Sequence, residues 1–128
     1  MMIQMMKNGG LMSKVVHFEL VAENPKRALE FYDKVFGWNI TKWDGLSDYW
    51  ICKTGRDDEF GIDGAIKPKL QNSKNMLTIN SDSLEKSMER IKKAGGVIVS
   101  DVIAVPGVVR FCRFRDCEGN ELEISEVI

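Results

Sequence analysis

Apolar and polar residues alternate in two short segments of the chain, residues 15–20 (VVHFEL) and residues 75–80 (NMLTIN). A period of two is typical of a strand with one buried face. A helical pattern follows each strand. Together, these patterns predict a strand and then a helix in each half of the chain.

The helical segments carry start and stop signals. In the first, Asn24 can cap the helix, Pro25 suits its first position and Gly37 can end it. In the second, Asp82 and Glu85 have capping-box spacing. The apolar stripes are Leu29, Tyr32 and Phe36 in the first helix and Leu84, Met88 and Ile91 in the second, which Gly95 and Gly96 end.

The two halves are related by an internal repeat. RDDE at 56–59 recurs as RDCE at 115–118, an offset of 59 residues that also carries helix residues of the first half onto those of the second. Three further strand candidates follow each helix, at 38–43, 48–53 and 61–67, and at 96–102, 108–114 and 120–125. We therefore expect one domain over 14–128, with units 14–67 and 75–128, a linker at 68–74 and a disordered tail at 1–13.

This organisation predicts an α+β fold of two tandem βαβββ units. The units would form one curved mixed sheet, with the helices on its convex side and a concave cup on the other. Residues expected to pack against the helices are Val16, Phe18, Leu77, Ile79, Leu122 and Ile124, and those expected to face the cup are His17, Glu19, Met76, Thr78, Glu121 and Glu123.

Composition narrows the function classes. Lysine and arginine (18) nearly balance aspartate and glutamate (19), without a basic run, which argues against nucleic acid as a partner. No apolar stretch is long enough to span a membrane. Three cysteines without CxxC spacing indicate reduced thiols and a cytoplasmic protein, with Cys52 and Cys112 buried and Cys117 in an exposed turn.

Three segments, HFELVAENPKRALEFYDKVFGW, SLEKSMERIKKAGG and FRDCEGNELEIS, carry a family resemblance. Over nearly all of 15–128 the chain resembles the glyoxalase, bleomycin-resistance and extradiol dioxygenase superfamily, also called vicinal oxygen chelate proteins. The resemblance implies a protein related to lactoylglutathione lyase. It also implies a cup often completed by a second chain, hence a homodimer.

The resemblance also implies a metal site that is incomplete here. The family's metal positions fall on His17 and Glu123, and the repeat offset gives Met76 and Gly64 as the other two, which are poor ligands. A catalytic metal usually has three protein ligands. Because only two ligands are present here, we expect no metal ion; the alternative is one nickel, zinc, manganese or iron ion. His17 and Glu123 are the candidate catalytic residues in either case, because histidine can act as an acid or base near neutral pH.

Aromatic residues gather in the first unit and could line a ligand pocket. The candidate pocket residues are Trp43, Trp50, Met76 and Glu121. Aromatic residues in strands also commonly belong to the core, and a solvated strand face is the competing interpretation for Glu121.

Three functions remain open. The first is a glyoxalase-related small-molecule enzyme of lyase, isomerase or dioxygenase type. The second is a metal-free binding or resistance protein that holds an apolar or aromatic molecule in the cup. The third is an interaction module whose cup is filled by its own side chains.

Overall fold

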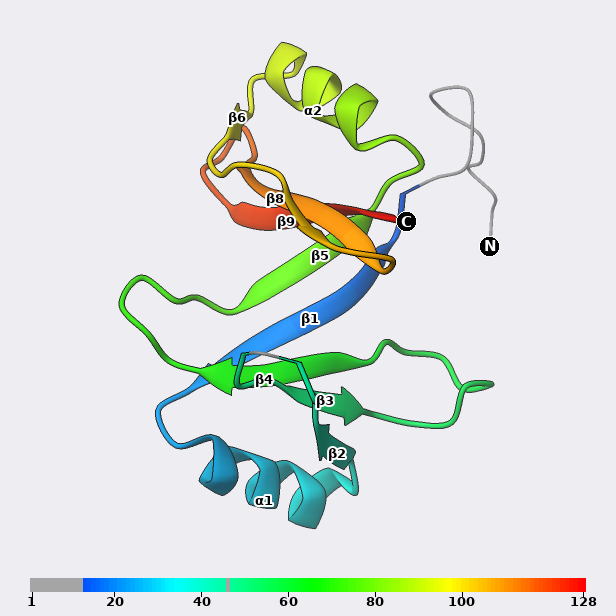
Figure 1. Cartoon of the computed structure of the whole chain (residues 1–128), viewed down its shortest axis with the longest axis vertical. Coiled ribbons are helices and arrows are strands. Elements are labelled where there is room, and N and C mark those ends of the chain that lie inside the picture. Colours follow the sequence, from blue (N-terminus) through cyan, green and yellow to red (C-terminus); the bar gives the residue numbers. More distant parts are fainter. Residues whose placement is uncertain (1–12, 46) are drawn as a thin grey trace. The chain divides into compact units, whose positions relative to one another are not determined.

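A computed structural model describes residues 13–45 and 47–128, and most of the expected tail lies outside these ranges. The chain forms two compact units, Val16–Leu77 and Thr78–Ile128, the second of which includes residues 13–15 (Figure 1). Each combines one helix with a mixed sheet. The predicted α+β class is confirmed, and the predicted βαβββ order is confirmed in the Val16–Leu77 unit.

The Val16–Leu77 unit contains β1, a helix and three further strands. Its elements are β1 (Val15–Ala22), α1 (Pro25–Phe36), β2 (Asn39–Lys42), β3 (Trp50–Lys53) and β4 (Gly64–Pro68). The strand order is β2-β3-β4-β1, with β1 and β4 parallel and the other neighbours antiparallel. The first and last strands of the repeat therefore lie side by side.

The ends of α1 are those that the sequence predicts. The Asn24 side chain accepts a hydrogen bond from the backbone N–H of Arg27, at 3.1 Å, and Pro25 is the first helical residue. Gly37 follows the helix with φ of +71°, a left-handed conformation that glycine adopts without steric cost.

The Thr78–Ile128 unit repeats this arrangement with one extra strand. Its elements are β5 (Met76–Asn80, which begins two residues before the unit), α2 (Leu84–Lys93), β6 (Val97–Ile98), β7 (Ile103–Val105), β8 (Val109–Arg115) and β9 (Glu121–Val127). β5 and β9 are parallel, β9 pairs with β8, and β8 pairs with β6 at one end and β7 at the other. The predicted strand at 96–102 is thus reduced to β6, and β7 was not predicted.

The cap of α2 differs from the prediction by one residue. Ser83, not Asp82, is the N-cap, and its side chain accepts from the backbone N–H of Lys86 at 3.3 Å. A second acceptor is Glu126 on β9, whose Oε1 takes a hydrogen bond from the Leu84 N–H at 2.8 Å. A contact from a distant strand leaves no local sequence pattern, so capping-box spacing could not reveal it.

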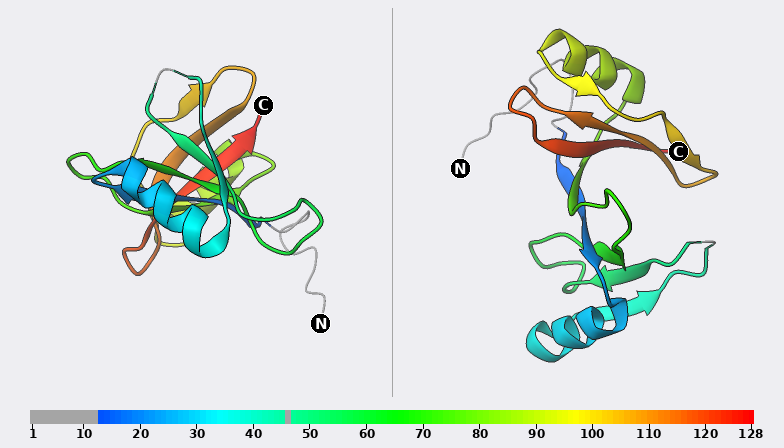
Figure 2. Two further views of the ribbon diagram at one scale, coloured as in Figure 1. Left: turned by 90° about the horizontal axis from the view of Figure 1, so that it is seen from below. Right: turned by 90° about the vertical axis from the view of Figure 1, so that its left-hand side faces the viewer.

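Strand register defines two faces for the sheet of the Val16–Leu77 unit. Phe18 lies opposite Gly64, and Leu20 opposite Ile66, so these residues share the face covered by α1 (Figure 2). His17 and Glu19 occupy the other face, together with Ala65 and Lys67, and we call this the His17 face. Its polar side chains form the candidate site described below.

The core of the Thr78–Ile128 unit lies between α2 and its sheet. Leu84, Cys112 and Ile124 are almost fully buried there, together with Phe114. Partly buried Ile79, Met88, Ile91, Ile98 and Leu122 surround them. Cys112 lies opposite Ile124 in register, so its thiol belongs to this core.

Some residues predicted to pack against the helices are largely exposed. Val16 is 42% exposed, Leu77 is 45% exposed and Phe36 is 61% exposed. The ten residues of α2 are only about 15 Å long, enough to cover Ile79 but not all of β5. The alternation assigned the strand faces, but burial also requires a helix above each residue.

The 59-residue offset is wrong by one residue for the last strand of the repeat, which is β4 in one unit and β9 in the other. Thr78 lies opposite Glu123, whereas Glu19, its counterpart in the repeat, lies opposite Ala65. Ala65 therefore takes the position of Glu123, and the assignment of this position to Gly64 is wrong. Gly64 faces α1, where an added Cβ would meet Phe18 ring carbons at 2.6 Å.

Neither described helix is long and apolar enough to cross a membrane.

Candidate functional site

Four polar side chains on the His17 face form a chain of hydrogen bonds. The Tyr49 hydroxyl lies 2.9 Å from His17 Nε2 and donates to Glu19 Oε2 at 2.6 Å. Lys67 Nζ donates to Glu19 Oε1 at 2.8 Å. We call His17, Glu19, Tyr49 and Lys67 the His17 cluster.

The members of this cluster differ in how much solvent they meet. The Glu19 side chain is 13% exposed, whereas those of His17 and Lys67 are 32% and 30% exposed. The carboxylate is therefore enclosed by the other groups. The imidazole and the ammonium remain accessible to a small molecule.

Glu19 is held in its ionised form. Burial alone would raise its pKa, but hydrogen bonds from Lys67 and Tyr49 outweigh burial and hold the pKa of this carboxyl below its usual value. Each of its two oxygens already accepts a hydrogen bond. Glu19 is thus a poor proton acceptor and a good anchor for its neighbours.

The surroundings of His17 favour its neutral form. Burial lowers the pKa of its imidazole, and the Lys67 ammonium acts in the same direction, while Glu19 and Asp63 partly offset them. Because ionised Glu19 can only accept, Tyr49 must donate its one proton to it and accept from His17. His17 Nε2 therefore carries the proton, and Nδ1 presents a lone pair.

Within the described residues, Nδ1 of His17 has no hydrogen-bond partner. In the same part of the chain, Lys67 Nζ donates to Glu19 alone. The ammonium can donate three hydrogen bonds and uses one on Glu19. The cluster thus presents one proton acceptor and one cationic donor on the same face. General acid–base chemistry needs such a pair.

Glu123 and Glu121 both lie on β9 and contact side chains of neighbouring strands in the Thr78–Ile128 unit. Glu123 Oε1 accepts from the Thr78 hydroxyl at 3.0 Å. Glu121, with a side chain only 12% exposed, lies 3.9 Å from Arg113 and 3.7 Å from Arg115. The interpretation of Glu121 as part of a solvated strand face is therefore wrong.

The predicted pocket residues occupy different positions. Trp43 packs edge-on against Tyr49, with ring centroids 6.1 Å apart, and so adjoins the His17 cluster. Trp50 lies opposite Ile66 in register, which places it on the α1 face instead. Met76, at the start of β5, is 5% exposed.

The donor groups of the His17 cluster are a poor match for a divalent metal. His17 Nε2 and both Glu19 oxygens are engaged, and the Lys67 ammonium would repel a cation beside Glu19. Over residues 13–45 and 47–128, no three His, Cys, Asp or Glu side chains are grouped to hold a metal ion. The His17 cluster therefore does not fit a divalent metal ion.

Tyr49 and Lys67 were not predicted as site residues. Tyr49 precedes β3, and its hydroxyl reaches β1, 30 residues away in sequence from Glu19. Lys67 could have been found from the alternation along β4, had Gly64 been assigned to the helix side. The repeat offset favoured the opposite assignment, because it matched Gly64 to Glu123.

The two buried cysteines are not candidate nucleophiles. Cys52 and Cys112 are fully buried, as predicted, and burial raises the pKa of both thiols, that of Cys52 to about 11. A thiol is a weak nucleophile until it loses its proton. Cys117 is exposed, also as predicted.

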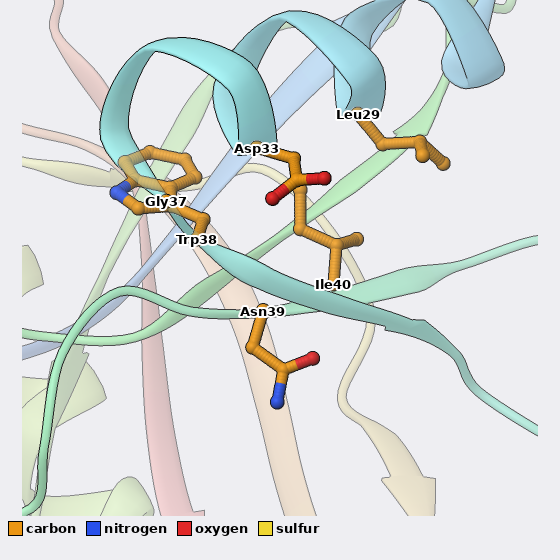
Figure 3. Close-up of a pocket in the computed structure, with 6 residues that line it drawn as sticks. All are labelled: Leu29, Asp33, Gly37, Trp38, Asn39 and Ile40. Carbon is orange, nitrogen blue, oxygen red and sulfur yellow. The ribbon is translucent and has the colours of Figure 1, made fainter.

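A pocket of about 290 Å³ lies beside α1, away from the His17 face (Figure 3). Leu29 and Asp33 of the helix line it, together with Gly37–Ile40 of the segment that follows. It contains one carboxylate and no basic group, so it offers no acid–base pair. None of the predicted site residues lines it.

Comparison with known proteins identifies the family to which this chain belongs. The family model of the Glyoxalase/Bleomycin resistance protein/Dioxygenase superfamily matches residues 14–124. The chain therefore belongs to this superfamily. A glyoxylase-like domain-containing protein of Didymella fabae is 31% identical over 119 residues, which cover 86% of this chain and 91% of that protein.

Solved structures share the fold at low sequence identity. A hypothetical protein of Bacillus halodurans is 13% identical, with a TM-score of 0.70 over 89% of this chain and 94% of the other. The methylmalonyl-CoA epimerase of Mycobacterium tuberculosis is 12% identical, with a TM-score of 0.69 over 98% and 92%. At these identities, the likeness shows the fold alone.

Proposed function

We propose that this chain is a small-molecule enzyme that transfers a proton at a carbon atom next to a carbonyl group. His17 is the base. The observation that carries the proposal is the hydrogen bond from His17 Nε2 to Tyr49, which leaves Nδ1 as the proton acceptor. A neutral imidazole positioned in this way typically accelerates proton transfer by about 10²–10⁴-fold.

The other cluster residues support this role. When Nδ1 takes the proton, the imidazole becomes a cation, and Tyr49 links it through two hydrogen bonds to ionised Glu19. The carboxylate stabilises the developing positive charge without becoming protonated itself. Glu19 and Tyr49 are therefore positioning residues and His17 is the catalytic residue.

Relatives make proton transfer at carbon a reasonable reaction class. Structural neighbours include methylmalonyl-CoA epimerases, one of which, from Streptomyces coelicolor, is described in complex with 2-nitronate-propionyl-CoA. A nitronate is a planar anion that resembles an enolate. Lyase and dioxygenase activities of the metal-dependent kind have less support, because the His17 cluster is a poor metal site.

The binding-protein alternative has less support as well. It needs aromatic side chains gathered on the ligand face, whereas Trp38 packs on Phe18 and Tyr32, and Trp50 shares the α1 face. Trp43 remains a proposed pocket residue, because it adjoins Tyr49. Glu123, in the Thr78–Ile128 unit, remains a proposed catalytic residue.

Hydrogen–deuterium exchange at carbon tests the proposal without knowledge of the substrate. The EDTA-treated protein is incubated in D₂O with 2-oxo acids, acyl thioesters, a glutathione hemithioacetal and nitroethane, and each C–H signal is followed by proton NMR. We expect exchange of at least one class to exceed that in buffer with equimolar imidazole. No acceleration across the panel, or acceleration only after metal is added, contradicts the proposal.

A homodimer is part of the same proposal, because the family resemblance implies a cup completed by a second chain. Sedimentation velocity at micromolar concentration should give one species of twice the 14.5 kDa chain mass. A predominantly monomeric sample would contradict this part alone.

A further inference from the structure

The position of Lys67 suggests a purpose beyond its ion pair with Glu19. Its ammonium lies at the edge of the His17 cluster, bound to Glu19 Oε1 at 2.8 Å, with a side chain 30% exposed. Within the described residues, Nζ has no second hydrogen-bond partner. Two N–H groups of the ammonium are therefore available to a ligand.

His17 and Lys67 both contact Glu19, so one small molecule can reach both. His17 Nε2 is 3.9 Å from one Glu19 oxygen, and Lys67 Nζ is 2.8 Å from the other. In an enolisable carbonyl compound, the acidic carbon and the oxygen are two bonds apart. Because both groups lie beside the same carboxylate, such a molecule can meet the imidazole at its carbon and the ammonium at its oxygen, with a contact of about 3 Å at each end.

We infer that Lys67 binds the carbonyl oxygen of the substrate and stabilises the negative charge that forms on it. This inference rests on the proposed function and names its substrate class: a small carbonyl compound that forms an enolate. The C–H bond breaks, its proton goes to His17 Nδ1, and the electron pair moves onto the oxygen beside Lys67. Return of a proton to carbon restores the enzyme, so no further reactant is needed.

The same arrangement explains how the cluster could work without a metal ion. In this chemistry, a cation beside the oxygen is what lowers the barrier. An ammonium with a free N–H supplies both the charge and a hydrogen bond. Glu19 orients it, and Tyr49, bound to the other carboxylate oxygen, keeps Glu19 from turning toward the substrate.

Binding of an enolate mimic tests this role directly. The probe is the nitronate of nitroethane, titrated in EDTA-containing buffer and followed in the proton–nitrogen NMR spectrum, which also reports whether each variant is folded. We expect Lys67→Met to weaken binding by about tenfold or more, because a hydrogen bond to a charged group is lost. Lys67→Arg keeps the charge and should retain most of the affinity.

Lys69→Met is the matched control. Lys69 lies two residues further along the chain, with a side chain 54% exposed, and pairs only loosely with Glu23 at 3.9 Å. Its replacement should leave nitronate binding unchanged. Equal binding by Lys67→Met and the unaltered protein, equal losses in Lys67→Met and Lys69→Met, or no binding in EDTA would each overturn the inference.

The two proposals fail differently. Carbon–hydrogen exchange that is as fast in Lys67→Met as in the unaltered protein overturns the role of Lys67 and leaves His17 as the base. Nitronate binding that depends on Lys67, with no exchange for any compound, overturns the proposed function and leaves an oxyanion site at Lys67.

Discussion

Replacing His17 with glutamine should lower the rate of carbon–hydrogen exchange by about 10²–10⁴-fold, the usual contribution of a positioned base. Glutamine can still donate a hydrogen bond to Tyr49, so the interaction at 2.9 Å has a substitute. It offers no nitrogen lone pair to the substrate, however. Exchange rates at saturating substrate, measured by proton NMR, give the comparison.

Tyr49→Phe is the companion variant for this prediction. It keeps the imidazole but removes the link between Nε2 and Glu19, so Nε2 is no longer required to hold the proton. We expect a smaller loss than in His17→Gln, with most of it in kcat. If His17→Gln keeps more than about one tenth of the rate, His17 is not the base.

Replacing Gly64 with alanine should destabilise the protein by about 2–3 kcal/mol, near the upper end for overpacking in a core. A Cβ at this position would meet the Phe18 carbonyl oxygen at 2.5 Å and the Phe18 ring at 2.6 Å. The Phe18 ring also packs against Trp38, with ring centroids 5.7 Å apart. Urea unfolding measures the difference in free energy.

Gly55→Ala provides the control for this prediction. Its Cβ would lie 3.2 Å from a Glu59 carboxylate oxygen, at the end of a flexible side chain that can move. We expect a change within about 1 kcal/mol there. A similarly small change in Gly64→Ala would contradict the register that places Gly64 on the α1 face and Lys67 on the His17 face.

The local patterns predicted the elements well because their causes are local. Asn24, Pro25 and Gly37 mark the ends of α1 through contacts within one helical turn. Strand alternation likewise assigned His17 and Glu19 to one face. At α2 the N-cap is Ser83 instead of Asp82, and a distant carboxylate, that of Glu126, accepts a further hydrogen bond from the first turn.

The candidate site was harder to predict because its contacts are long-range. His17 was selected through the family resemblance, but its partners Tyr49 and Lys67 depend on how three strands lie in register. The repeat suggested that both units have the same strand register. On β4, however, Ala65 and not Gly64 takes the position of Glu123, so the residues of this strand were assigned to the wrong faces. Trp50 was proposed from the clustering of aromatic residues, which does not define a strand face; its face follows from its pairing with Ile66.

The central claim, that the His17 cluster keeps an unprotonated Nδ1 and binds no metal, has a direct spectroscopic test. His17 is the only histidine in the sequence, so its two ring nitrogens give unambiguous ¹⁵N signals in a protein without a histidine tag. We predict a protonated Nε2 and an unprotonated Nδ1 at neutral pH in EDTA. The midpoint of titration should lie below the ordinary value of about 6.5, because burial lowers the pKa of His17.

The exchange rate should then rise with pH through this same midpoint and level off above it, because only the neutral imidazole accepts a proton. Addition of zinc or nickel in the absence of EDTA should leave both ring signals in place. An imidazolium at neutral pH, a proton on Nδ1 instead of Nε2, or a stoichiometric change of the signals with metal would contradict the account.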